Sequence, residues 1–294
     1  MQDSRYTIQN DHLRIAVQAK GAELVSLYNK KEKLEYMWSG DPAFWGKHSP
    51  VLFPIIGTLK NDTYYYKDKA YHLARHGFAR DMEFTVTEQT TSSIGFSLLS
   101  NAGTLQKFPF EFGFDIVYLL QQDRLTVTYR VKNSGNSDMY FSVGGHPAFK
   151  VPLVEGTDYD DYYLEFNKTE NTGRWPISAE GLIETDAEPF LLNTSKLPLR
   201  KELFYRDAIV FKNLRSDTVR LRSSRHHKGI EFHFPGFPYL GIWAAKDAGF
   251  VCIEPWCGIA DPVNSNQQLT EKEGINCLAP GLVFERSWGV GLEI

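Results

Sequence analysis

The sequence predicts an all-β protein, a large antiparallel β-sandwich, and three observations point to that class. Aromatic residues make up 14% of the chain, and many of them sit in short runs where apolar and polar residues alternate. Alternation with a period of two is typical of strands that bury one face. Turn residues separate many of these runs, and no stretch of about 10 to 15 residues with helical periodicity lies between them. A parallel sheet with crossover helices is therefore disfavoured.

The expected strands follow one another along the whole chain. In RLTVTYRVKN, for example, Leu125, Val127 and Tyr129 share one face. The other runs of this kind are HLRIAVQ, MEFTVTE, DIVYLL, DAIVFKNL, TVRLRS, IEFHF and YLGIWAA. SNAGTLQKF predicts at most a short helix, and the polar stretch of residues 154–198 predicts long surface loops around one strand, DYYLEF. Because no linker, repeat or low-complexity tract interrupts the chain, we expect residues 1–294 to form one domain.

Composition excludes several classes of function. Lys and Arg number 32 against 36 Asp and Glu, so the net charge is -4 and there is no basic footprint for nucleic acid. The first residues lack the apolar run of a secretion signal, and nowhere do about 18 apolar residues run together. We therefore expect a cytoplasmic protein without a membrane partner. Its cysteines, Cys252, Cys257 and Cys277, are expected to be reduced.

Signatures of common cofactors and metals are missing from the sequence. It has no GxGxxG, GxxxxGK[ST], HExxH, CxxC or GxSxG. His72 and His76 have metal-ligand spacing only on a helix, whereas Gly77 interrupts their segment, LARHGFAR. We expect neither a cofactor nor a metal.

His146 stands out in SVGGHPAFKVP, between two glycines and a proline. Gly144 and Gly145 allow a close approach of the backbone or unusual dihedral angles, and Pro147 favours an extended His146. Imidazole titrates near pH 6.5, which suits a general acid. A hydrogen-bonded core histidine is the alternative.

Glu254 is a carboxylate at the end of an apolar strand in GFVCIEPWCGIAD. Burial would raise the pKa of this carboxyl toward that of a useful general base. The alternative is a structural role, in which Glu254 is bound to the backbone or to an arginine. Trp256 offers a flat apolar face for a sugar ring. Asp261 also fits the cap of a turn.

Five motifs in order carry a resemblance to a known family: LFPIIGTLKND, HGFARDMEF, GGHPAF, FPGFPYLGIW and IEPWCGIADP. From about Leu13 to Trp288 the chain resembles the aldose 1-epimerase (galactose mutarotase-like) family, and most of all its bacterial LacX-like branch. The resemblance implies a single-domain β-supersandwich and metal-independent interconversion of the α and β anomers of an aldose. It implies that Glu254 is the general base and His146 the general acid, with His76 and Asp207 binding the sugar.

One position departs from the family pattern. Thr58 stands in GTLKND where family members usually carry a sugar-contacting arginine. Arg75, Arg80 or Lys60 would then fill that role, or the substrate would differ from the familiar hexoses.

Three functions follow as hypotheses. The first is a mutarotase of carbohydrate metabolism, acting on a free hexose and working as a monomer or homodimer. The second is a hexose-6-phosphate epimerase, with a phosphate clamp from Lys47, Lys60, Arg75 or Arg80. The third is a catalytically silent carbohydrate-binding or regulatory protein, which the presence of both His146 and Glu254 disfavours.

Overall fold

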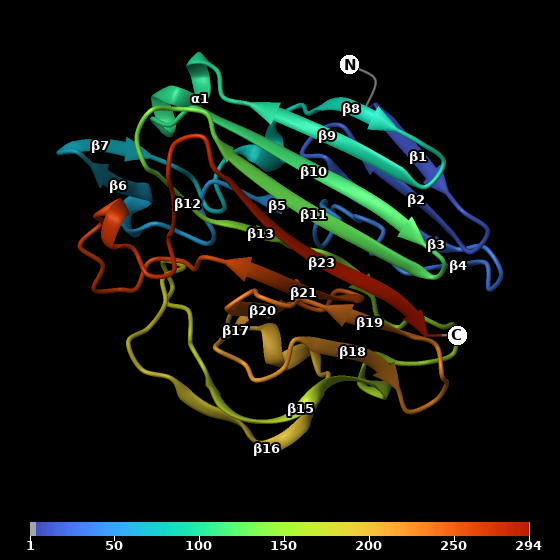
Figure 1. The fold of residues 1–294 in the computed structure, drawn as a ribbon. Helices are drawn as coiled ribbons and strands as arrows, with labels where there is room; N and C mark the ends of the chain where they lie inside the picture. Colours follow the sequence, from blue (N-terminus) through green and yellow to red (C-terminus); the bar gives the residue numbers. More distant parts are fainter. Residues whose placement is uncertain (1–3, 294) are drawn as a thin grey trace.

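Antiparallel sheets form the framework of the protein, as the computed structural model of Figure 1 shows for residues 4–293. The largest sheet has nine strands in the order β16-β15-β18-β19-β23-β11-β10-β9-β8. Its strands are β8 (Thr85–Gln89), β9 (Ser93–Leu99), β10 (Phe112–Gln121), β11 (Arg124–Asn133), β15 (Tyr162–Arg174), β16 (Glu188–Pro198), β18 (Thr218–Ser223), β19 (Gly229–His233) and β23 (Val283–Glu293). The predicted all-β class is confirmed.

A second sheet lies against the first, in the order β17-β20-β21-β13-β5, with β14 also paired to β21. Its strands are β5 (Val51–Leu52), β13 (Val143–Gly145), β14 (Ala148–Lys150), β17 (Ile209–Lys212), β20 (Tyr239–Trp243) and β21 (Phe250–Cys257). All eight residues of β21 are buried, because both faces of this central strand are covered. The strand can therefore hold a polar side chain away from bulk water.

Smaller elements complete the fold. The remaining strands are β1 (Arg5–Gln9), β2 (Leu13–Gln18), β3 (Glu23–Asn29), β4 (Leu34–Glu35), β6 (Thr63–Tyr66), β7 (Lys69–His72), β12 (Met139–Phe141) and β22 (Asn276–Leu278). The helices are α1 (Ala102–Lys107) and the 3-10 turns η1 (Lys60–Asp62), η2 (Ala79–Asp81), η3 (Tyr159–Asp161), η4 (Lys201–Phe204) and η5 (Leu269–Glu271). Within residues 4–293, no helix is long and apolar enough to cross a membrane.

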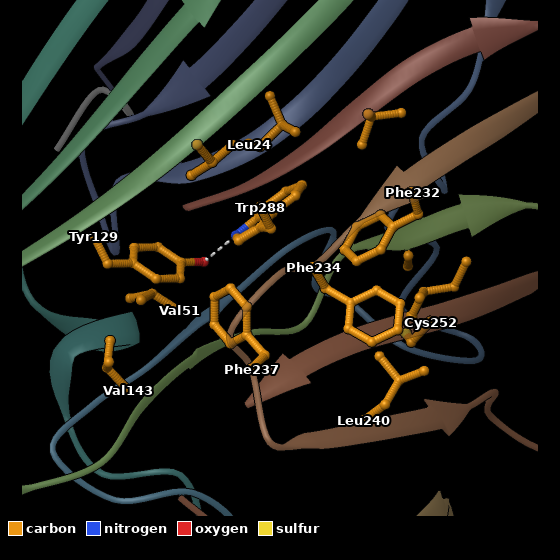
Figure 2. Close-up of a cluster of buried hydrophobic side chains, with 14 of the residues drawn as sticks. Leu24, Val51, Tyr129, Val143, Phe232, Phe234, Phe237, Leu240, Cys252 and Trp288 are labelled. Atoms are coloured by element: carbon orange, nitrogen blue, oxygen red, sulfur yellow. Dashed lines mark hydrogen bonds between the residues drawn. The ribbon is translucent and has the colours of Figure 1, made fainter. Parts of the chain in front are cut away.

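Aromatic side chains fill the space between the two large sheets (Figure 2). Phe149 of β14 meets Phe232 of β19 with ring centroids 6.0 Å apart. Trp288 of β23 stacks on Phe232 and donates from Nε1 to the Tyr129 hydroxyl at 2.9 Å. The buried tryptophan therefore satisfies its one polar group inside the core.

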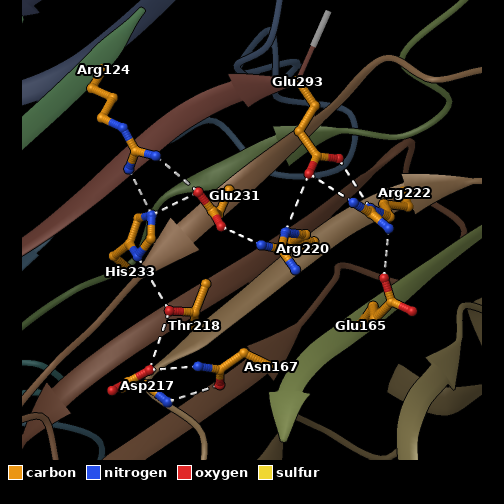
Figure 3. Close-up of polar contacts among 10 residues, drawn as sticks. All are labelled: Arg124, Glu165, Asn167, Asp217, Thr218, Arg220, Arg222, Glu231, His233 and Glu293. Carbon is orange, nitrogen blue, oxygen red and sulfur yellow. Dashed lines mark hydrogen bonds and ion pairs between the residues drawn. The ribbon is translucent and has the colours of Figure 1, made fainter.

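The outer face of the nine-stranded sheet carries a ladder of charged side chains across β15, β18, β19, β23 and β11 (Figure 3). Arg222 pairs with Glu165 at 2.8 Å and with Glu293 at 3.0 Å. Arg220 pairs with Glu231 at 2.5 Å. The polar side chains of these strands thus lie on the outer face of the sheet and the apolar ones on the inner face, which explains the alternating pattern in the sequence.

Most sequence expectations hold, and one is corrected. Every alternating run found in the sequence overlaps a strand, and α1 is the short helix expected, capped by the Asn101 side chain. The stretch of residues 154–198 was expected to form loops around one strand. Instead β15 and β16 form a long, bulged hairpin at the edge of the nine-stranded sheet. The expectation of a single domain stays a prediction.

Candidate active site

A cavity of about 450 Å³ opens beside β21, and seven of the candidate residues from the sequence line it. They are Arg75, His76, Arg80, His146, Asp207, Glu254 and Trp256. Its volume is within the range of about 300–1,000 Å³ that small-molecule sites occupy. Residues from distant parts of the chain therefore converge on one site.

His146 and Glu254 face each other in this cavity. His146 lies between β13 and β14, which both pair with β21, so its imidazole stands opposite Glu254. Its Nε2 is 3.3 Å from a carboxylate oxygen of Glu254. Glu254 lies within β21, three residues before the strand ends, and is only 1% exposed. The other imidazole nitrogen, Nδ1, has no hydrogen-bond partner among residues 4–293.

The glycines before His146 are required by close packing. A Cβ on Gly144 would lie 2.8 Å from the backbone oxygen of Pro255, and one on Gly145 would lie 2.6 Å from the Tyr129 hydroxyl. Real Cβ atoms do not approach other atoms so closely, so a larger residue at position 144 would push β13 away from β21, and one at position 145 would clash with Tyr129 of β11. The close approach that the sequence predicted is confirmed.

Burial controls the protonation of this pair. It raises the pKa of the Glu254 carboxyl well above its usual value, and the positive charge of Arg75 only partly opposes the rise. Burial also lowers the pKa of His146 to about 3. Because both groups favour their neutral forms, the pair holds one exchangeable proton near neutral pH.

Two tryptophans that the sequence analysis did not single out enclose the imidazole of His146. Trp45 packs nearly face-on, with centroids 4.9 Å apart and planes inclined by 30°. Trp243 of β20 meets His146 edge-to-face at 5.5 Å. The two indoles exclude water from the imidazole and fix its orientation.

His76 reaches the cavity from a turn rather than a helix. Its φ is 69°, and its Nδ1 accepts a hydrogen bond from the backbone N–H of Gly57 at 3.0 Å. The proton of the neutral ring is therefore on Nε2. His72 lies on β7 and its Nδ1 hydrogen-bonds the Thr63 hydroxyl instead, so the two histidines are not paired.

Asp207 and Arg75 form an ion pair at the cavity wall, with Nη2 and Oδ1 3.2 Å apart. Asp207 has a φ of 147°, which costs about 1–3 kcal/mol in a non-glycine residue. The same Oδ1 accepts the N–H of Ala208 at 2.7 Å. Backbone strain of this kind is typical of ligand-binding positions.

The structure places the candidate replacements for the missing arginine differently. Arg75 and Arg80 line the cavity, and Arg80 donates to the backbone oxygen of Arg75 at 2.9 Å. Lys60 instead donates from Nζ to the Val263 carbonyl at 2.9 Å. Thr58 lies beside Gly181, where an added Cβ would come within 2.7 Å of its hydroxyl. Of these candidates, the two arginines are the ones that line the cavity.

Asp261 does more than cap a turn. Its Oδ1 is 2.6 Å from Nζ of Lys272, and both side chains are 3% exposed. Its Oδ2 accepts the backbone N–H of Lys60, and its own N–H donates to the carbonyl of Thr58. This buried ion pair thus fixes the loop that begins at Gly57 and supports His76.

Trp256 presents its ring to the cavity, as expected, and packs against Gly241 of β20. Its Nε1 is buried and finds no acceptor in the described part of the chain. Two further lining residues, Tyr205 and Arg206, were missed in the sequence. Their only signal was their position next to Asp207.

The fold and the site together define a class: a β-sandwich whose cavity joins a buried histidine–carboxylate pair with aromatic and cationic side chains. The family model "Aldose 1-epimerase" matches residues 4–274. The chain belongs to the aldose 1-epimerase family.

Individual relatives agree with this assignment. Protein LacX of Lactococcus lactis subsp. lactis is 34% identical over 292 residues, which cover 96% of this chain and 97% of LacX. A galactose mutarotase related enzyme from Lactobacillus acidophilus is 36% identical, with a TM-score of 0.94 over 99% of this chain and 98% of its own. A galactose mutarotase-like protein from Lactobacillus casei is 34% identical, with a TM-score of 0.93 over 99% and 100%.

Proposed function

We propose that this protein is an aldose 1-epimerase that interconverts the α and β anomers of a hexose by opening and reclosing the sugar ring. One observation carries the proposal: His146 and Glu254 lie 3.3 Å apart in the wall of a sugar-sized cavity. The ring oxygen and the anomeric hydroxyl of a hexose are bonded to the same carbon. The two oxygens are therefore close enough together for one to contact His146 while the other contacts Glu254.

Ring opening moves one proton onto the sugar and another off it. Glu254, as the carboxylate, accepts the proton of the anomeric hydroxyl, while His146, as the imidazolium, donates its proton to the ring oxygen. The bond between the anomeric carbon and the ring oxygen breaks, and the free aldehyde forms. The pair is now a carboxylic acid and a neutral imidazole, the forms that burial favours.

Reclosure reverses the roles of the two groups. Rotation about the bond next to the aldehyde presents its other face to the hydroxyl. His146 takes back the proton of that hydroxyl as it attacks, and Glu254 returns a proton to the new anomeric oxygen. General acid and base assistance is worth roughly 10²- to 10⁴-fold each. No cofactor enters this scheme.

Other lining residues orient the sugar in this proposal. His76 donates from Nε2, because its Nδ1 is occupied by the Gly57 N–H. Asp207 and Arg75 supply an acceptor and donors for sugar hydroxyls at the wall of the cavity. Trp256 provides the apolar surface for the carbon–hydrogen face of the ring.

A hexose 6-phosphate is the second candidate substrate, favoured by the cations around the cavity. Arg75, Arg80 and Arg206 all line it, and a guanidinium grips a phosphate through paired donors. Lys47 pairs with Asp81 at 3.3 Å and Lys60 with backbone carbonyls, which leaves the arginines as the expected clamp.

A substrate panel tests both candidates. Freshly dissolved α-anomers of several aldoses and their 6-phosphates are followed by optical rotation with and without protein. We expect faster mutarotation for at least one compound. If Arg206→Ala reduces the rate for the phosphate and spares the free sugar, the phosphate is the substrate. A protein that binds a hexose but accelerates none of the panel would be the silent binding protein.

A further inference from the structure

A buried thiol lies beside the His146–Glu254 pair and has no part in the proposed reaction. Cys252 precedes Glu254 by two residues on β21, so the two side chains leave the strand on the same face. Its neighbours in the register are Ala148 of β14 and Trp243 of β20. Cys252 is 0% exposed.

The possible ligand atoms of His146, Cys252 and Glu254 all lie within 4.8 Å of one another. Thiolate, imidazole and carboxylate are the three ligand types that zinc takes in proteins. We propose that these three residues form a binding site for Zn²⁺ or a similar transition-metal ion, and that the bound ion inhibits the protein by occupying the proton-transfer pair.

The spacing of the ligand atoms suits a tetrahedral ion. Bonds of about 2.0–2.3 Å place neighbouring ligand atoms roughly 3.4–3.7 Å apart. The nitrogen of His146 and the oxygen of Glu254 are 3.3 Å apart, close to that value. The sulfur of Cys252 needs to approach by roughly an ångström at most, within the reach of small side-chain rotations.

The charges of the site also balance. A divalent cation bound by one thiolate, one carboxylate and a neutral imidazole gives no net charge, which suits a buried position. Binding releases two protons, one from the thiol and one from the His146–Glu254 pair. Mg²⁺ and Ca²⁺ prefer oxygen ligands and more of them, so the site selects softer ions.

Inhibition follows from which atoms the ion would occupy. The Nε2 of His146 and the carboxylate of Glu254 are the groups that exchange protons with the sugar in the proposed function. An ion bound to both blocks that exchange. The metal site itself requires no epimerase activity, so binding and catalysis can be tested separately.

Cobalt(II) is the probe, because a thiolate ligand gives cobalt an intense near-ultraviolet absorption band. The reference protein is Cys277→Ser, since Cys277 is an exposed thiol outside the cavity. We expect this protein to show the thiolate band, and added Zn²⁺ to abolish it. Cys252→Ala should lose the band, whereas the matched control Cys257→Ala, which removes another buried thiol of β21, should keep it.

Two further variants keep the test decisive if Cys252→Ala folds poorly. Glu254→Gln and His146→Asn each remove one ligand and should weaken Zn²⁺ binding by at least about tenfold, measured by competition with a chromophoric chelator. A reference protein without the band, or an unchanged band in folded Cys252→Ala, would overturn the proposal. So would unchanged Zn²⁺ affinity in both of the other variants. Where the wild type is active, Zn²⁺ should inhibit it and a chelator should restore it.

Discussion

The buried ion pair of Lys272 and Asp261 offers a sharp test of how the site is supported. Lys272→Met keeps the length of the side chain and removes its charge. In the wild type the ammonium is 2.6 Å from the Asp261 carboxylate, and both side chains are 3% exposed. Burial lowers the pKa of Lys272, and the charge of Asp261 opposes that shift. The substitution leaves a buried carboxylate whose remaining partner is the backbone N–H of Lys60.

The expected loss is about 3–5 kcal/mol in the free energy of unfolding, the usual result of breaking a buried pair from one side. Urea unfolding at pH 7, followed by circular dichroism, measures it. Lys47→Met is the matched control, because its partner Asp81 is more than half exposed, and it should cost less than about 1 kcal/mol.

A double variant completes this test. Asp261→Asn in the Lys272→Met background should recover part of the loss, because an asparagine oxygen still accepts the Lys60 N–H without a buried charge. If Lys272→Met costs no more than Lys47→Met, the ion pair does not hold the loop.

The remaining predictions concern the cavity. The pKa of His146 is about 3 in the folded protein against about 6.5 in the unfolded chain, so this histidine favours unfolding more strongly as the pH falls, whereas the raised pKa of Glu254 acts in the opposite direction. From pH 6.5 to 5, the stability of the wild type relative to His146→Asn should therefore fall by roughly 1.6 kcal/mol in urea unfolding, and a constant difference would contradict this. Trp45→Leu removes the ring face packed on His146 and should lower kcat about 3- to 30-fold with little change in KM; an unchanged kcat would rule out this role. Arg75→Ala and Arg80→Ala should each raise KM by about tenfold or more. Thr58→Arg should not raise activity, because Thr58 packs beside Gly181. A tenfold gain from Thr58→Arg, with no effect of the two alanine substitutions, would refute the idea that Arg75 or Arg80 replaces the family's loop arginine.

The strands were predictable where one face meets the core and the other meets water. Leu125, Val127, Tyr129 and Val131 of β11 are all buried, and the residues between them are more exposed, so their alternation was visible in the sequence. The β15–β16 hairpin lacked this signal. Beyond Phe166 most of its residues are exposed or half-buried, and bulges shift its register. Backbone pairing without a buried face leaves no periodic pattern.

The site was predictable to the extent that its residues conflict with their local surroundings. Glu254 is a carboxylate within an apolar strand, and the glycines before His146 indicate a close approach of the backbone. Trp45 and Cys252 present no such conflict, because a tryptophan in a loop and a cysteine in an apolar strand are both ordinary. Only the tertiary fold brings them to His146.

The central claim is that His146 and Glu254 form the proton-transfer pair. Magnetisation exchange between the two anomeric protons, measured by NMR at equilibrium, reports ring opening directly. For the best substrate of the panel, we expect the wild type to accelerate exchange. Glu254→Gln and His146→Asn should each slow turnover by about 10² or more, with sugar binding altered much less.

The pH dependence of the same exchange rate adds a second criterion. Only the form of the pair with one shared proton can both donate and accept, so the rate should follow a bell whose limbs belong to the pair. Exchange that stays fast in both variants would contradict the assignment of the pair. A wild type that binds a hexose and yet exchanges its anomers no faster than buffer would contradict the proposed activity itself.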